Sequence, residues 1–239
     1  MIAAVVLGIL ILILVVVTLD DGSSPAPGAV PVNGNPAEHA ISAPRGSLAA
    51  STFSLLSGAA SVTVRTADIG GDLYRVSTPV DSGLLPKALD RDGRVELQLV
   101  NDGPPGATAV DVQLSAQVKW SIRMAGGATQ EALELDTGKV AAVDLVVGAT
   151  HIDVTLPKPT GTIPIRVTGG ASDLAVHTPA GVPSRVSANN GAGSITLNGV
   201  ARSGISAGTV LNTPGWESAT DRYDVQLVSG VGVLTVDNR

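Results

Sequence analysis

Hydrophobic and polar positions alternate along most of the chain, and a recurring glycine interrupts the alternation. In each recurrence the glycine is followed by small or polar residues and then by apolar residues at every second position. The regularly spaced copies begin at Gly106, Gly127, Gly148, Gly170 and Gly191, at intervals of 21, 21, 22 and 21 residues. Two further copies begin at Gly58 and Gly230. A constant period of about 20 residues is typical of stacked repeat architectures.

The apolar positions keep the same phase on both sides of the glycine. The fourth and sixth residues after it include Val62, Val64, Val110, Val112, Leu133, Ile152, Val154, Leu174, Val176, Ile195, Leu197, Leu234 and Val236. The fifth and third residues before it include Phe53, Leu55, Ile122, Met124, Val143, Leu145, Ile165, Val167, Val186, Ala188, Val225 and Leu227. A period of two is the pattern of a half-buried strand. Each copy is therefore predicted to form a strand, a glycine corner and a second strand.

Stacking of these units predicts buried columns in which like residues lie above one another. Val154, Val176 and Leu197 are then expected on consecutive rungs of one column. Glu131 is the exception, because it follows Gly127 at a position that is apolar in the other copies. We expect a local bulge or an opening of the stack at Glu131.

These patterns predict an all-β fold: a short single-stack β-solenoid, toast-rack or β-helix-like, preceded by one transmembrane helix. We divide the chain into a transmembrane anchor at residues 1–19, a linker rich in Pro, Gly and Ser at residues 20–50, and a β-repeat domain at residues 51–239. Residues 71–105 and 199–222 break the period. They are expected to leave the stack as loops.

The anchor prediction depends on residues 1–19, MIAAVVLGILILILVVVTL, which contain no charged side chain. As a helix they would measure roughly 28 Å, close to the roughly 30 Å hydrocarbon core of a bilayer. A cleaved signal sequence is the alternative, but no basic residue precedes the run and it is long for a signal. We therefore expect an uncleaved single-pass anchor that contacts the lipid bilayer of the cell membrane. The C-terminal domain is then extracytoplasmic, or secreted if the anchor is cleaved.

Composition narrows the possible functions. The chain contains no cysteine, which excludes disulfides, a thiol nucleophile and Cys-ligated zinc. Its net charge is −6 and it has only five aromatic residues. Nucleic-acid binding needs clustered Lys and Arg, usually with aromatic platforms, so nucleic acid is not expected as a partner.

Outward positions of neighbouring copies bring charges together. Arg123, Asp144 and Arg166 each lie four residues before a glycine, so Asp144 is expected between two arginines. This row is either a charged binding strip or a solvated ladder of ion pairs, each worth roughly 0–1 kcal/mol. His151 is expected beside Asp173 by the same argument.

Trp216 follows Pro214 and Gly215 in the second interruption of the period. We regard it either as a contact residue for a ligand or as a cap over an open end of the stack. With Arg123, Asp144 and Arg166 it completes the possible binding surface.

Catalytic motifs are weak. Gly204, Ser206 and Gly208 match G-x-S-x-G, but no helix pattern follows and no histidine occurs after His177. The three histidines, His39, His151 and His177, lack metal-ligand spacing, and we expect His151 and His177 on outward positions. We therefore predict no enzyme activity, no catalytic residues, no metal and no cofactor.

Residues 168–200, TGGASDLAVHTPAGVPSRVSANNGAGSITLNGV, and residues 220–237, TDRYDVQLVSGVGVLTVD, resemble the bacterial "putative adhesin" or toast-rack domain. They are also similar to the C-terminal domain of LiaF-like cell-wall-stress proteins. The resemblance implies a short β-helix-like stack, often membrane-tethered, without catalytic residues. It favours an envelope scaffold or adhesion-type binding module whose partner is an envelope protein or a cell-wall polymer. The alternative is an envelope-stress sensor that signals through a membrane partner.

Overall fold

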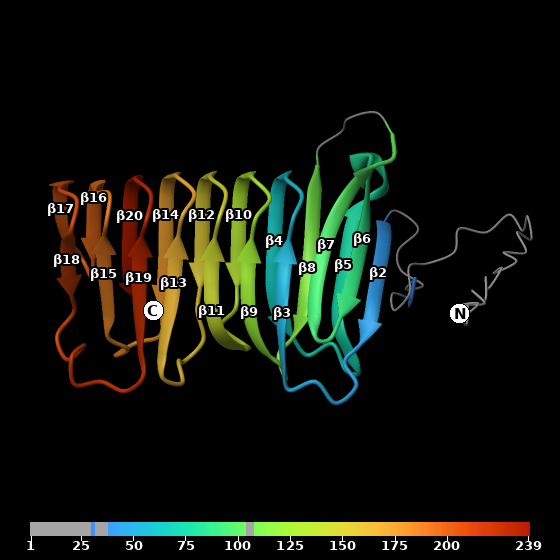
Figure 1. Ribbon diagram of the computed structural model, residues 1–239, viewed down its shortest axis with the longest axis horizontal. Helices are drawn as coiled ribbons and strands as arrows, with labels where there is room; N and C mark the ends of the chain where they lie inside the picture. Colours follow the sequence, from blue (N-terminus) through green and yellow to red (C-terminus); the bar gives the residue numbers. More distant parts are fainter. Residues whose placement is uncertain (1–29, 32–37, 104–107) are drawn as a thin grey trace, which may run out of the picture.

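The computed structural model describes residues 30–31, 38–103 and 108–239 of the chain. They form two long sheets that face each other (Figure 1). The larger sheet has, in spatial order, β1 (Val30–Pro31), β2 (Glu38–Pro44), β5 (Asp72–Pro79), β8 (Ala109–Ser115), β4 (Ala59–Ala67), β10 (Ala128–Glu134), β12 (Ala149–Thr155), β14 (Ala171–Thr178), β20 (Val231–Asn238), β16 (Ala192–Leu197) and β17 (Val200–Ile205). The smaller sheet has β18 (Thr209–Asn212), β15 (Ser184–Ala188), β19 (Arg222–Leu227), β13 (Thr162–Val167), β11 (Lys139–Leu145), β9 (Lys119–Met124), β3 (Ala50–Leu55), β7 (Arg94–Asn101) and β6 (Leu84–Arg91). A short 3₁₀ helix, Val80–Ser82, joins β5 to β6.

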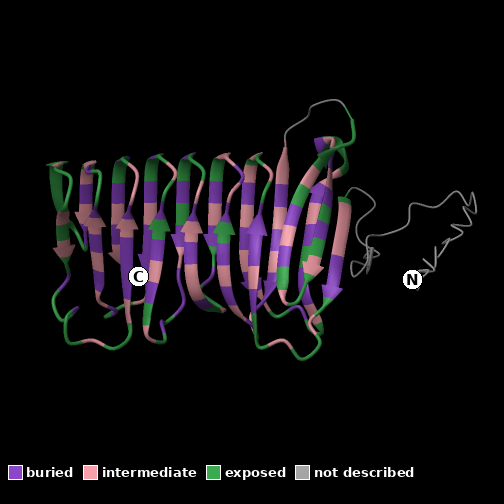
Figure 2. Ribbon diagram, viewed as in Figure 1, coloured by how far each residue is buried: buried purple, intermediate pink, exposed green. Residues whose placement is uncertain are grey.

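Each predicted repeat forms one rung, with its first strand in the smaller sheet and its second in the larger. Rungs such as β9–β10 and β11–β12 stack in parallel, and equivalent residues are directly in register. The alternating apolar residues on both sides of the glycine are buried between the sheets, as Figure 2 shows for the strand interiors. The all-β repeat fold and its period-two phase are therefore confirmed.

The glycine corner is required by the spacing of the rungs. Successive corners lie so close that a Cβ on Gly148 would be 2.5 Å from the carbonyl oxygen of Gly170. A Cβ on Gly126 would be 2.0 Å from the carbonyl oxygen of Ser57. A side chain at Gly126 or Gly148 would push neighbouring backbones apart, whereas Gly170 and Gly230 have room for a Cβ.

The rungs do not follow one another in sequence order. The last rung, β19–β20, lies between β13–β14 and β15–β16, which are earlier in the chain (Figure 1). Val176 is therefore in register with Val236, and Val236 with Leu197. The prediction that Val176 and Leu197 lie on consecutive rungs is wrong, because each stacks on Val236 instead.

Antiparallel strands occupy both ends of the stack. The first interruption of the period forms β5, β6 and β7, and the second forms β17 and β18. These segments were expected as loops, but most of their residues extend the two sheets. The folded part also begins before residue 51, because β2, in the segment assigned to the linker, pairs with β5.

Glu131 lies in the buried column between Val62 and Ile152, with unbroken parallel register to both. The expected bulge is therefore absent from β10. The residue is 3% exposed, and neither carboxylate oxygen has a hydrogen-bond partner. Burial raises the pKa of Glu131 to about 7, because a charged carboxylate is poorly solvated among apolar side chains.

The predicted anchor, residues 1–19, lies outside the described residues. Within the part of the chain that the structure describes, no helix is long and apolar enough to cross a membrane.

Candidate binding surface

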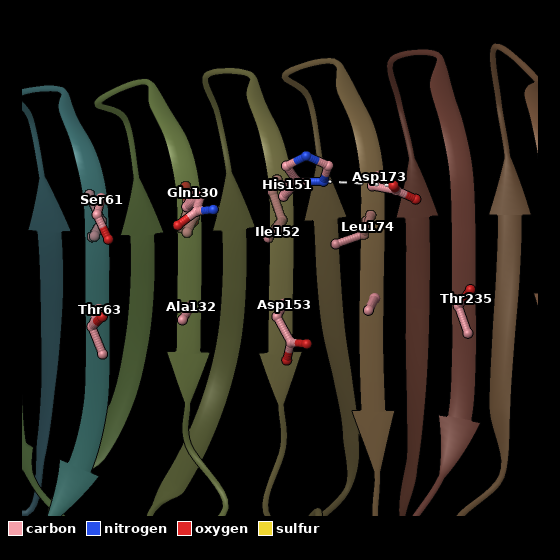
Figure 3. Close-up of a pocket in the computed structure, with 13 residues that line it drawn as sticks. Ser61, Thr63, Gln130, Ala132, His151, Ile152, Asp153, Asp173, Leu174 and Thr235 are labelled. Carbon is pink, nitrogen blue, oxygen red and sulfur yellow. Dashed lines mark ion pairs between the residues drawn. The ribbon is translucent and has the colours of Figure 1, made fainter.

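A shallow groove of about 450 Å³ crosses the outer face of the larger sheet (Figure 3). It spans β4, β10, β12 and β14 and reaches Thr235 of β20. Its outward side chains come from the third and fifth positions after each glycine, because these alternate with the buried fourth and sixth positions. They are Ser61, Thr63, Gln130, Ala132, His151, Asp153, Asp173, Ala175 and Thr235.

The groove is shallow because the fifth-position side chains are short. Thr63 and Ala132 leave the sheet surface low, whereas Gln130, His151 and Asp173 stand along one side (Figure 3). The surface therefore offers hydroxyl, amide, imidazole and carboxylate groups along an open line that runs across the strands. Such a line suits an extended ligand better than a small molecule, which usually occupies an enclosed pocket.

His151 and Asp173 are neighbours, as their repeat positions predict. They are in register on β12 and β14, and His151 Nδ1 lies 3.6 Å from Asp173 Oδ2. Both side chains are more than half exposed, so solvent screens their attraction and it stabilises the fold little. Both therefore remain accessible to a ligand.

His177 was expected on an outward position open to solvent, but it is only 3% exposed. Its Nδ1 lies 2.6 Å from Asp237 Oδ1 and its Nε2 lies 3.2 Å from Asp153 Oδ2. A neutral imidazole has one N–H and a protonated one has two, so only the protonated ring donates to both carboxylates. This Asp–His–Asp row fixes Asp153, which lines the groove.

The row Arg123, Asp144 and Arg166 lies on the other sheet. Asp144 is in register with both arginines. Arg166 Nη1 lies 3.5 Å from Asp144 Oδ1, and no ion pair is recorded between Asp144 and Arg123 among the described residues. The structure thus brings the three residues together in a row, but separates that row from the groove by the thickness of the sandwich.

Trp216 is 5% exposed. The guanidinium carbons of Arg185 and Arg222 lie 3.9 and 4.0 Å from its ring centroid. Its Nε1 donates to the carbonyl oxygen of Tyr223 at 3.0 Å. The indole is therefore enclosed by β15, β19 and the loop before β19, and little of its ring is open to a ligand.

Arg185 also binds Asp224 through two hydrogen bonds of 2.8 and 2.9 Å. Burial alone raises the pKa of Asp224, but hydrogen bonds from Arg185 and Gln226 outweigh it, so the net pKa is below its ordinary value. The ion pair and the stacked Trp216 together join the last rung to β15.

The pairs His177–Asp237 and Arg185–Asp224 were not predicted from the sequence, although their repeat positions carry a signal. His177 and Asp237 both lie seven residues after their glycines, and Arg185 and Asp224 both lie six residues before theirs. Equivalent positions touch only on adjacent rungs. The out-of-order insertion of β19–β20 is what makes these rungs adjacent.

Catalytic geometry is not found in the described residues. Ser206 lies in the turn between β17 and β18, not in a strand-to-helix turn. No group of three or more His, Cys, Asp or Glu side chains there could hold a metal ion.

No protein-family model and no curated protein matches the chain. Among solved structures it is similar to a putative cell adhesion protein from Clostridium sporogenes, with 13% identity and a TM-score of 0.61. That match covers 84% of this chain and 99% of the other.

Putative adhesins from Bacteroides fragilis and Parabacteroides distasonis are each 10% identical to this chain. The match to the Bacteroides adhesin covers 82% of this chain and 96% of the other, with a TM-score of 0.31. The match to the Parabacteroides adhesin covers 83% of this chain and 95% of the other, with a TM-score of 0.21. The chain shares its overall fold with the putative cell adhesion protein from Clostridium sporogenes.

Proposed function

We propose that the chain is a non-catalytic binding module of the adhesion type, held at the cell envelope by residues 1–19. The fold shared with the putative cell adhesion protein of Clostridium sporogenes supports this class of function. The groove on the larger sheet supplies the surface, because it is open, polar and continuous across several rungs.

The open line of polar groups in the groove is the observation that carries the proposal. A polymer or an extended protein segment lying along the stack axis would meet equivalent positions about every 4.8 Å, the spacing of hydrogen-bonded strands. His151 and Asp173 would contact it at one side, and Asp153 at the centre. Each contact is weak alone, so affinity would come from many of them along one ligand.

Two substitutions of alanine by arginine test whether the groove binds the ligand. Ala132→Arg places a long charged side chain on the groove floor, whereas Ala142→Arg places the same side chain on the opposite sheet. Ala132 and Ala142 are both half-buried. Full-length protein in detergent micelles is sedimented with purified cell-wall sacculi. We expect the wild type and Ala142→Arg to sediment and Ala132→Arg to stay in solution.

Equal sedimentation of the two variants would place the binding site elsewhere. If the wild type does not sediment with sacculi, the ligand is not a wall polymer. The same pair of variants then tests cross-linking to envelope proteins in intact cells.

The tethering part of the proposal rests on the uncharged run at residues 1–19. Protease added to intact spheroplasts should digest the β domain while the N-terminal segment stays in the membrane. Full protection of the domain would contradict the orientation. A mature N-terminus near residue 30 would contradict the uncleaved anchor.

A further inference from the structure

The end of the stack formed by β17 and β18 is open. Each is the terminal strand of its sheet, so each has a neighbour on one edge only. β17 is exposed over nearly its whole length (Figure 2). Val200 on β17 is 61% exposed and Val210 on β18 is 55% exposed, the highest values among the large hydrophobic residues that the structure describes. Solenoid ends normally carry a polar cap, which keeps them soluble.

A pocket of about 390 Å³ lies at this end. Its lining includes Leu197, Val200, Arg202 and Leu211. Directly opposed residues of an antiparallel pair project to the same face. Val200 is opposite Leu197, and Arg202 is opposite Ile195. Because Leu197 and Ile195 are buried, Val200 and Arg202 project from the core side of β17.

Arg202 is the one charged residue between positions 198 and 216. No ion pair between described residues includes it. Arg202 is exposed and lines a pocket of mixed apolar and polar residues, and it has no carboxylate partner within the described part of the chain. A guanidinium pairs with a carboxylate through two parallel hydrogen bonds, and at an exposed site such a pair is worth up to about 1 kcal/mol.

We propose that this end of the stack binds an extended peptide strand that carries a carboxylate. The free edge of β17 offers backbone N–H and C=O groups, which a peptide strand satisfies by adding to the sheet. Arg202 then pairs with an acidic side chain and Val200 packs against an apolar one. Because Val200 and Arg202 are two residues apart on one face, the acidic and apolar residues of the peptide are also two apart.

A second copy of the chain is a poorer occupant. Two copies joined through their β17 edges about a two-fold axis would bring their Arg202 residues near each other, and like charges across a strand pair are destabilising. The pocket shares no lining residue with the groove on the larger sheet, so the proposal is independent of ligand binding at the groove.

The test uses fluorescein-labelled peptides and full-length protein in detergent micelles, with binding followed by fluorescence anisotropy. The acidic peptide is Thr-Val-Thr-Glu-Thr-Thr, and its matched controls carry Gln or Lys in place of Glu. A fourth peptide carries Pro at the central Thr, which removes an N–H needed for strand addition. We expect the wild type to bind the Glu peptide about threefold more tightly than the Gln peptide, and the Pro peptide not at all.

Arg202→Gln should remove the preference for Glu, and Arg202→Glu should transfer the preference to the Lys peptide. Arg91→Gln, at an exposed site on β6 at the opposite end of the stack, should leave the Glu preference unchanged. Thermal unfolding confirms that each variant is folded. An unfolded variant would not gain a preference for the Lys peptide, so this gain in Arg202→Glu separates a change of specificity from loss of structure.

Three results would overturn the proposal. They are equal binding of the Glu and Gln peptides by the wild type, retention of the Glu preference in Arg202→Glu, and tight binding of the Pro peptide. Analytical ultracentrifugation provides the last check. A dimer that dissociates on Val210→Lys would show that a second copy, not a peptide, covers this end.

Discussion

His177 and Asp237 lie 60 residues apart in sequence, yet His177 Nδ1 is 2.6 Å from Asp237 Oδ1. The two residues occupy the same position of two repeats, on β14 and β20. They are in contact because the chain first forms β15 to β18 at the end of the stack, and then inserts β20 between β14 and β16. The Asp–His–Asp row is therefore a direct chemical consequence of the order of the rungs.

Because His177 is buried and His151 is exposed, we expect His177, but not His151, to stabilise the fold. Replacing His177 with Gln removes the contacts that this 3% exposed ring makes with Asp153 and Asp237, and should lower the free energy of unfolding by about 1–3 kcal/mol. His151→Gln removes a pair that is more than half exposed on both sides and should cost less than about 0.5 kcal/mol. Chemical denaturation at pH 6 measures both. Equal costs would show that the buried row contributes nothing.

Glu131 predicts an unusual dependence of stability on pH. Its pKa in the folded protein is raised to about 7 from 4.5. The folded state therefore holds a proton that the unfolded state releases between these values. The contribution of Glu131 to stability is complete below pH 4.5 and is lost as the pH rises through 7. Between pH 5 and pH 8 its ionisation should cost the fold about 2–3 kcal/mol.

Glu131→Gln removes the ionisation, and Glu134→Gln, at an exposed site on the same strand, is the control. We expect the stability of Glu131→Gln relative to the wild type to increase from pH 5 to pH 8, while Glu134→Gln tracks the wild type. Urea titrations at the two pH values measure this. Parallel pH profiles for the wild type and Glu131→Gln would mean that the carboxyl is solvated.

The glycine corners give a matched pair of substitutions. A Cβ at Gly148 would lie 2.5 Å from a backbone oxygen, whereas a Cβ at Gly230 would meet nothing within 4 Å. Gly148→Ala should therefore destabilise the protein by on the order of 2 kcal/mol. Gly230→Ala should be neutral or slightly stabilising. Melting temperatures test the difference, and similar values would show that the corners relax without cost.

Engineered disulfides test the order of the rungs, because the natural chain has no cysteine. Thr196 and Thr235 are in register on adjacent strands, and Ala175 is in register with Thr235. Thr196→Cys with Thr235→Cys should cross-link on oxidation. Ala175→Cys with Thr196→Cys should not, because the Cα atoms of strands two places apart are about 10 Å apart and a disulfide spans less than about 7 Å. Non-reducing electrophoresis would show the opposite pattern if the rungs followed the sequence.

The alternation of apolar residues was sufficient to predict the interior of the stack. Val154 and Val176 are buried neighbours, as their repeat positions require. The order of the last rungs could not be predicted in the same way. Leu197 and Val236 occupy equivalent positions and are both apolar, so hydrophobicity does not decide which of them stacks on Val176.

The candidate sites were predicted less completely than the fold. His151 and Asp173 were paired correctly because they lie on rungs that are consecutive in both sequence and space. The groove itself depends on short side chains over four strands, which no single motif marks. The LiaF-like relationship and the stress-sensor role stay predictions, since no observation on the described residues tests them.

The position of β19–β20 has a consequence for synthesis on the ribosome. β15 and β16 are made before the strands that join them to β13 and β14, so they have no parallel neighbour until residues 222–238 emerge. This end of the stack therefore cannot close progressively as the chain elongates. Its strands must either wait unpaired or dock temporarily on β13–β14 and later be displaced, and in both cases the final arrangement forms only after translation has passed the last rung.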